Sequence, residues 1–286
     1  MQKVFLSLVL LLCTFMQGCG AVKLTYNNAD TLLYWWLDGY VDFTLDQKPR
    51  AKDELLAFQQ WHRKVQLPQW VAMAQTLQQQ VLEDVTPALL CQNFDQAQAL
   101  IPTLSNYLEP AVLWLATSLS PDQIQSIADK YAKTNKDWRK EWQPGTQQAL
   151  MKASEKSLRE RIDPLYGKLT DTQLVLLRAA IAASPFDAAT AYAERLRRQQ
   201  DLLGVLKQIQ SKQLSADAAK EPMRALLARN QDSPDAAYRA YGQRVKQHYC
   251  DLFSQLHNSM SAQQRTYALG QLQGYERDFK TLQAAR

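Results

Sequence analysis

Apolar residues recur along this chain at the helical spacing of three to four positions, and no stretch alternates apolar and polar residues over the length of a strand. Glycine is scarce, whereas alanine, leucine and glutamine, which favour helices, are abundant. Several prolines stand where a helical pattern begins, as at Pro68, Pro87 and Pro121, because the first helical turn tolerates proline. The pattern therefore predicts an all-α protein.

Short connections separate the expected helices, as between antiparallel neighbours in a bundle. The expected segments are residues 28–44, a helix after Pro49, then 68–85, 87–100, 102–119 with an interruption at Pro110, 121 to Pro144-Gly145, 147–162, 171–183, 186–210, 216–230, 235–258 and 262–284. We expect a multi-helix bundle of about ten to twelve helices that forms a single large domain over residues 28–286.

The first expected helix holds the densest aromatic run of the chain, from Tyr34 to Tyr40. Its apolar face is so wide that only the aspartates look solvated. That face comprises Leu33, Trp36, Leu37, Tyr40, Val41 and Thr44, widened by Leu32, Trp35 and Phe43. We expect a central, buried helix with Trp36 and Tyr40 in the core. The alternative is an interfacial helix that lies on a membrane.

Residues 1–18 have the form of a targeting segment. Lys3 supplies a positive charge, and Val4 to Phe15 form an apolar stretch that is shorter than the roughly 20 residues of a membrane span. Gly18-Cys19 resembles the bacterial lipobox, which implies that the mature chain begins at Cys19 and carries acyl chains there. Residues 19–27 would then be a lipidated tether. An ordinary secretory peptide followed by an incidental cysteine is the alternative.

The residue after Cys19 bears on the compartment. Inner-membrane lipoproteins often have aspartate there, and this chain has Gly20. We therefore expect an outer-membrane lipoprotein that is attached by its lipid and whose body faces the periplasm.

The cysteine count predicts a covalent link. Cys13 lies in the targeting segment and Cys19 is the expected lipidation site, so only Cys91 and Cys250 remain free to pair. We predict a disulfide between them, because the periplasm is oxidising. Two buried thiols are the alternative.

One short string recurs at helix starts: an apolar residue, Ser or Thr, two further residues, then Gln. It occurs at Ser120 with Gln123, at Thr170 with Gln173 and at Ser261 with Gln264, and Ser215 begins a looser copy. The string predicts capping boxes. In a capping box the hydroxyl accepts from the backbone N–H of the glutamine, and the glutamine side chain accepts from the backbone N–H of the Ser or Thr. It also resembles the Leu-Thr-x-x-Gln motif of the Spy-type periplasmic chaperones, which are small all-helical envelope proteins.

The sequence offers little that indicates catalysis or nucleic-acid binding. The formal charge is +5, and +4 (5 − 1) once Lys3 is removed, which is too small to indicate a nucleic-acid partner. Phosphate-binding loops, nucleophile elbows and zinc-protease motifs are absent from the sequence. His248 and His257 are nine positions apart, which does not place them together on a helix face, so no metal or cofactor is expected.

Two charged groups remain as candidates. Asp38 and Asp42 are four positions apart, and a carboxylate pair of this kind could act as general acid and base on a glycan strand. The basic run from Glu194 to Arg198 splays around a helix and is expected to form a solvated or ion-paired face.

Four N-terminal motifs together resemble a proteobacterial lipoprotein family known only as a domain of unknown function. They are Gly18-Cys19, Tyr26-Asn27-Asn28-Ala29-Asp30, Trp35-Trp36-Leu37-Asp38 and Tyr40-Val41-Asp42. The resemblance implies a helical outer-membrane lipoprotein and supplies no activity. We therefore expect a role in envelope interaction or maintenance, with the membrane and an envelope protein as partners. A chaperone-like binder of unfolded envelope proteins is the alternative, and a peptidoglycan-acting enzyme the third hypothesis.

Overall fold

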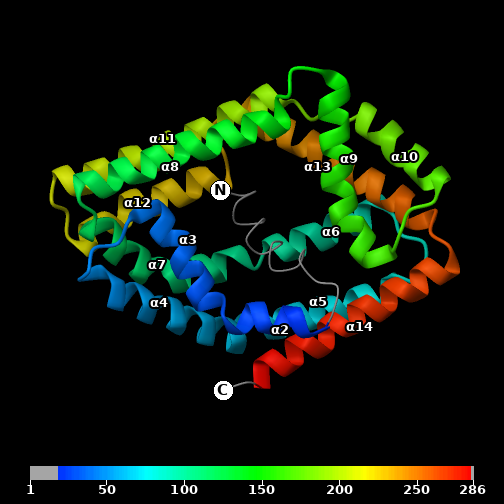
Figure 1. Cartoon of the computed structure of the whole chain (residues 1–286), viewed down its shortest axis with the longest axis horizontal. Helices are drawn as coiled ribbons and strands as arrows, with labels where there is room; N and C mark the ends of the chain where they lie inside the picture. Colours follow the sequence, from blue (N-terminus) through cyan, green and yellow to red (C-terminus); the bar gives the residue numbers. More distant parts are fainter. Residues whose placement is uncertain (1–18, 285–286) are drawn as a thin grey trace.

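The computed structural model describes residues 19–284, and of residues 19–22 the backbone alone. Over this range the chain forms thirteen α-helices and one π-helical turn, without a strand (Figure 1). The elements are α2 (Cys19–Asn27), α3 (Ala29–Val41), α4 (Gln47–Trp61), η1 (His62–Gln66), α5 (Leu67–Gln80), α6 (Pro87–Gln98), α7 (Ile101–Ser118), α8 (Pro121–Trp142), α9 (Gln147–Tyr166), α10 (Asp171–Ala182), α11 (Ala188–Ser211), α12 (Ala216–Gln231), α13 (Ala236–Asn258) and α14 (Ala262–Ala284). The predicted all-α, single-domain fold is confirmed.

The expected helices correspond to α3 through α14, and the additional helix is α2. It occupies the segment expected to be a tether, and it packs against α14 instead of standing free. The predicted interruption at Pro110 is wrong, because α7 continues through that proline. The targeting segment, residues 1–18, lies outside the described residues.

Six helices enclose the largest hydrophobic core. α3, α4, α7, α8, α11 and α12 lie together on the left of Figure 1. The buried core residues are Tyr34, Val41, Phe43, Ala51, Leu113, Ala116, Leu119, Ile124, Ile127, Val205, Leu206, Ile209, Ala219, Met223 and Leu226. These side chains come from both the first half and the second half of the chain, so the core joins distant segments.

Smaller cores complete the other half of the molecule. α9, α10 and α13 enclose Leu177 and Leu256, whose side chains are fully buried. α5 and α14 run side by side along the lower edge of Figure 1. α2 packs onto α14, where Tyr26 and Leu282 share a small core. The first and last described helices therefore lie against each other.

The predicted disulfide is present and joins α6 to α13. The Cα atoms of Cys91 and Cys250 are 5.5 Å apart, and the two residues are separated by 159 positions in the sequence. α6 contributes no fully buried side chain, although it packs along α13. The covalent bond therefore holds a helix that has little hydrophobic attachment of its own.

The prediction that α3 is a central, buried helix is wrong on one side. Tyr34 and Val41 are buried, and Tyr40 packs against the core. Trp36, however, is 38% exposed and Trp35 65% exposed. The sequence pattern counted apolar residues around the whole helix, whereas its packed neighbours, chiefly α4 and α8, cover one side of it.

Candidate functional site

The recurring Ser/Thr-x-x-Gln strings form hydrogen-bonded polar sites at helix starts. At the start of α8, Gln123 N donates to Ser120 Oγ (3.2 Å), and Ser120 N donates to Gln123 Oε1 (3.0 Å). Thr170 with Gln173 and Ser261 with Gln264 have the same reciprocal bonds at the starts of α10 and α14. All three pairs form the predicted capping boxes. Ser215 caps α12 through its hydroxyl alone.

A fourth capping box was missed by the sequence analysis. Thr44 N donates to Gln47 Oε1 (3.1 Å), and Gln47 N donates to Thr44 Oγ1 (3.3 Å) at the start of α4. The signal was available, because Phe43-Thr44-Leu45-Asp46-Gln47 has the same form as the other three strings. It was hidden by the prediction that the first helix extends to Thr44.

The four boxes are arranged in two pairs, which we call clasps. In the first clasp, residues 43–47 lie against residues 119–123. Gln123 Nε2 donates to Gln47 Oε1 (2.6 Å), and Gln47 Nε2 lies 3.3 Å from Gln123 Oε1. Each glutamine side chain also donates to a backbone carbonyl of the other string. Gln47 donates to Ser118 O (2.9 Å), just before Leu119, and Gln123 donates to Asp42 O (3.1 Å), just before Phe43.

The second clasp joins residues 169–173 to residues 260–264 with the same geometry. The Nε2 and Oε1 atoms of Gln173 and Gln264 lie 3.0 Å apart in both directions. Gln173 also donates to Ser259 O (3.1 Å), and Gln264 Nε2 lies 3.4 Å from Lys168 O. The fold therefore uses one device twice, once in each half of the chain.

The clasps are structural and not reactive. The apolar residue that precedes each box is buried, namely Phe43, Leu119, Leu169 and Met260. Both amide groups of each clasp are occupied by internal hydrogen bonds, which is how a buried polar group is stabilised. The glutamines therefore fix how two helix starts meet, and they leave no group free for chemistry.

Two of the three histidines are largely buried, and each is hydrogen-bonded to a tyrosine. His257 Nε2 donates to Glu83 O (2.7 Å), so its Nδ1 accepts from the Tyr166 hydroxyl (2.7 Å). Burial lowers the pKa of His257. Nδ1 of His62 lies 2.7 Å from the Tyr26 hydroxyl, and burial lowers the pKa of His62 to about 4. These histidines connect α9 to α13 and α2 to η1.

A buried ion cluster lies along α11. Glu194, which is 5% exposed, accepts hydrogen bonds from Arg197 Nε (2.7 Å) and Arg198 Nε (2.6 Å). Burial raises the pKa of Glu194, but the hydrogen bonds from both arginines outweigh it and leave that pKa below its usual range. The expected ion pairing is present. Of the two expected forms, solvated or ion-paired, the second holds, and Glu194 and Arg198 are in addition buried because α11 is covered on that side.

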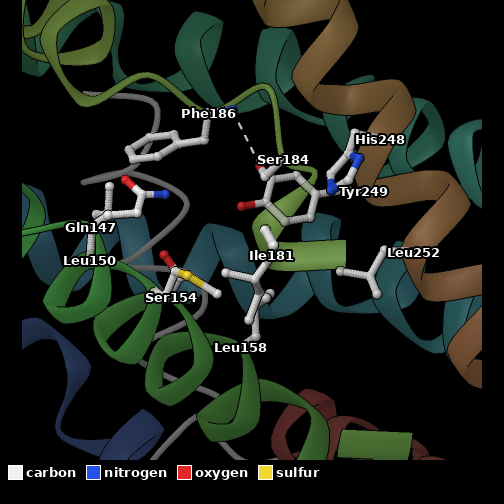
Figure 2. Close-up of a pocket in the computed structure, with 12 residues that line it drawn as sticks. Gln147, Leu150, Ser154, Leu158, Ile181, Ser184, Phe186, His248, Tyr249 and Leu252 are labelled. Atoms are coloured by element: carbon white, nitrogen blue, oxygen red, sulfur yellow. Dashed lines mark hydrogen bonds between the residues drawn. The ribbon is translucent and has the colours of Figure 1, made fainter. Parts of the chain in front are cut away.

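A hollow with a volume of about 50 Å³ lies between α9, α10 and α13. Figure 2 shows its wall of apolar side chains together with Ser154, Ser184, His248 and Tyr249. His248 Nε2 is buried there without a hydrogen-bond partner. Sites for small molecules or cofactors are usually about 300 Å³ or larger, so this hollow fits one or two water molecules.

Asp38 and Asp42, the carboxylate pair considered for acid–base chemistry, are both bonded near the end of α3. Asp38 Oδ1 accepts from Phe43 N (2.9 Å) and so closes the end of α3, while the Asp42 carbonyl accepts from Gln123 in the first clasp. The Asp38 carboxylate therefore shapes the turn after α3, and Asp42 contributes to it through its backbone. Over residues 19–284, no group of three His, Cys, Asp or Glu side chains could hold a metal ion.

Comparison with protein families identifies one matching family. A model described as "Family of unknown function (DUF6279)" matches residues 39–239, which is more than half of the chain. The chain belongs to this family. The DUF6279 match includes the whole first clasp and residues 169–173 of the second clasp, and it ends before Cys250 and residues 260–264. No curated protein and no solved structure matches the chain.

Proposed function

We propose that this protein is an outer-membrane lipoprotein whose helical body acts in the periplasm as a non-catalytic factor for envelope interaction or maintenance. The acyl chains are carried by Cys19, which follows an apolar segment and Gly18. No helix within residues 19–284 is long and apolar enough to cross a membrane. Attachment in this proposal comes from the lipid.

The disulfide between Cys91 and Cys250 is the main observation that supports a periplasmic location. Disulfides persist in oxidising compartments such as the bacterial periplasm and are rare where glutathione keeps thiols reduced. The lipobox-like Gly18-Cys19 supports the same compartment independently, because lipidation of that kind accompanies export.

The clasps and the buried ion cluster support a rigid scaffold as the function class. Their polar groups are satisfied by one another, and groups of this kind define a single arrangement of helices. A scaffold that presents fixed surfaces suits binding to an envelope partner. The Asp38 carboxylate accepts from Phe43 N, so the aspartate pair gives the enzyme hypothesis less support than its spacing alone did.

A chaperone-like function is the second candidate, because the clasp strings resemble the Spy-type motif. In this chain the motif residues are mutually bonded, so an unfolded client would have to contact other surfaces. The discriminating measurement is suppression of client aggregation by the body carrying Cys19→Ala. Suppression at stoichiometric amounts supports the chaperone, and its absence together with co-purification of one folded partner supports the scaffold.

The lipid anchor is tested by labelling growing cells with an alkyne analogue of palmitate. The unaltered chain should take up the label, and Cys19→Ala should lose it and accumulate as an uncleaved or soluble form. Cys13→Ala is the matched control, since Cys13 lies in the segment that is removed, and it should label normally. Label that persists in Cys19→Ala would refute the anchor.

A further inference from the structure

Four large apolar side chains near the proposed lipid anchor are exposed to solvent. Leu24 on α2 is 66% exposed, and Leu32, Trp35 and Trp36 on α3 are 51%, 65% and 38% exposed. We call these four residues the anchor-proximal patch. α2 and α3 are the two blue helices that begin the ribbon in Figure 1.

The packing of α3 fixes the direction in which Leu32, Trp35 and Trp36 point. Tyr34 is 4% exposed, and its ring stacks on Phe43 with centroids 5.8 Å apart. Val41 is buried in the same core, between α3 and its neighbours α4 and α8. Because one side of α3 is held in the core, the opposite side cannot turn inward to hide Leu32 and Trp35.

The grouping of these residues sets them apart from other exposed apolar residues. Leu32, Trp35 and Trp36 have the spacing i, i+3, i+4 and so share one face of the helix. Every other helix of the described chain contributes at most one large exposed apolar side chain, such as Val175 on α10 or Tyr267 on α14. Single exposed apolar residues are normal, whereas a group needs an explanation.

The position of the patch relative to Cys19 indicates what covers it. Trp36 follows Cys19 by 17 positions, which is no more than about 26 Å at a helical rise of about 1.5 Å per residue. Acyl chains on Cys19 would hold the start of α2 at the bilayer surface. Tryptophan and leucine suit that surface, since the indole combines a large apolar ring with a polar N–H.

A protein partner suits the patch less well than a bilayer. A stable protein interface uses roughly 20–30 residues on each side. The anchor-proximal patch has four large apolar side chains, and it lies on the two helices that follow the lipidation site. A lipid surface needs no such area, because the acyl chains already supply the main attachment.

We propose that the anchor-proximal patch inserts into the interfacial layer of the same bilayer that holds Cys19, as a second point of membrane contact. This inference rests on the proposed lipid anchor. Two points of contact fix the orientation of the body, so that α3 lies on the membrane and the body cannot swing freely on its lipid.

The test uses the mature, lipidated chain reconstituted into phosphatidylcholine vesicles whose acyl chains carry bromine, which quenches nearby tryptophans. Flotation of the vesicles reports the anchor, and tryptophan emission reports the patch. The chain has seven tryptophans, so the quenched ones are identified by substitution. Trp35→Phe/Trp36→Phe should abolish the quenching, and Trp138→Phe/Trp142→Phe, the matched control on α8, should retain it. In Figure 1 α8 lies across the molecule from α2.

A second variant guards against a folding defect in the tryptophan variant. Leu24→Gln/Leu32→Gln changes only side chains that are more than half exposed, and it keeps all tryptophans. It should float as the unaltered chain does and lose most of the quenching. Val175→Gln/Tyr267→Gln, which removes exposed apolar side chains elsewhere, should not reduce it.

Three results would overturn the proposal, and they are distinguishable. A chain that floats with the vesicles but is not quenched refutes the membrane contact and leaves the anchor standing. A chain that does not float refutes the anchor and the proposed function with it. A photoreactive amino acid in place of Trp35 should capture lipid in intact cells, and capture of a protein chain instead would assign the patch to a protein partner.

Discussion

Removing the side chain of Gln123 should destabilise the protein far more than the loss of an ordinary helix cap. Gln123 is 4% exposed, and its side chain takes part in four hydrogen bonds. Its Oε1 accepts from Ser120 N and Gln47 Nε2, and its Nε2 donates to Asp42 O and Gln47 Oε1. At about 1 kcal/mol net for each bond, Gln123→Ala should lower the free energy of unfolding by about 4 kcal/mol.

The pairing itself is measured by a double-mutant cycle with Gln47→Ala. Gln47 is also buried, and two of its bonds are the ones it shares with Gln123. Each single variant should lose about 4 kcal/mol, and the double variant about 6 kcal/mol rather than 8, because the shared bonds are lost only once. The assay is urea unfolding of the mature body carrying Cys19→Ser, followed by circular dichroism at 222 nm.

Ser215→Ala is the matched control. Ser215 caps α12 by accepting from Ala218 N (3.2 Å), and the residue at the glutamine position of the box is Ala218. Loss of such a cap costs about 1 kcal/mol. If Gln123→Ala cost no more than Ser215→Ala, or if the two glutamine variants were additive, the clasp would not be the stabilising unit that its geometry indicates.

Three further predictions concern the disulfide, the histidines and α3. Replacing Cys91 and Cys250 by Ser should lower the free energy of unfolding by about 5 kcal/mol, since the bond closes a loop of 159 residues, and an unchanged urea midpoint would contradict this. Lowering the pH from 7 to 4 should lower the free energy of unfolding by about 3 kcal/mol because of His62. Its pKa is about 4 when folded and 6.5 when unfolded, so the unfolded chain gains a proton that the folded chain does not. His62→Gln should flatten that pH dependence, and equal slopes for both proteins would refute the role of His62. Tyr34→Ala should cost about 3–5 kcal/mol as a core truncation, and Trp36→Ala clearly less because Trp36 is 38% exposed; equal thermal shifts would place both in the core.

The fold class and the local caps could be predicted from the sequence because both depend on neighbouring residues. A capping box is complete within four residues, so Ser120 with Gln123 is recognisable without a structure. The disulfide followed from a count, since only Cys91 and Cys250 were left to pair. The pairing of capping boxes into clasps is different, because it joins positions 76 and 91 residues apart, and no local pattern records it.

Burial was predicted less well than helix formation, for a related reason. The pattern of α3 shows that many of its residues are apolar, but the helices that pack against α3 decide whether Trp35 is covered. The same holds for Glu194 and Arg198, which look like surface charges in the sequence and are buried as an ion pair. Hydrophobic periodicity shows which face of a helix is apolar, and tertiary packing decides which faces are buried.

The contact between α2 and α14 has a consequence for the order in which the protein matures. Among the described helices a ribosome makes α2 first and α14 last, so the contacts of α2 with α14, including the Lys23–Asp278 ion pair at 3.2 Å, form only after α14 exists. Acylation of Cys19 before that point would modify a segment that still lacks its α14 neighbour. In the proposed lipoprotein the N-terminal segment would thus be attached to the membrane before α14 completes the packing of α2.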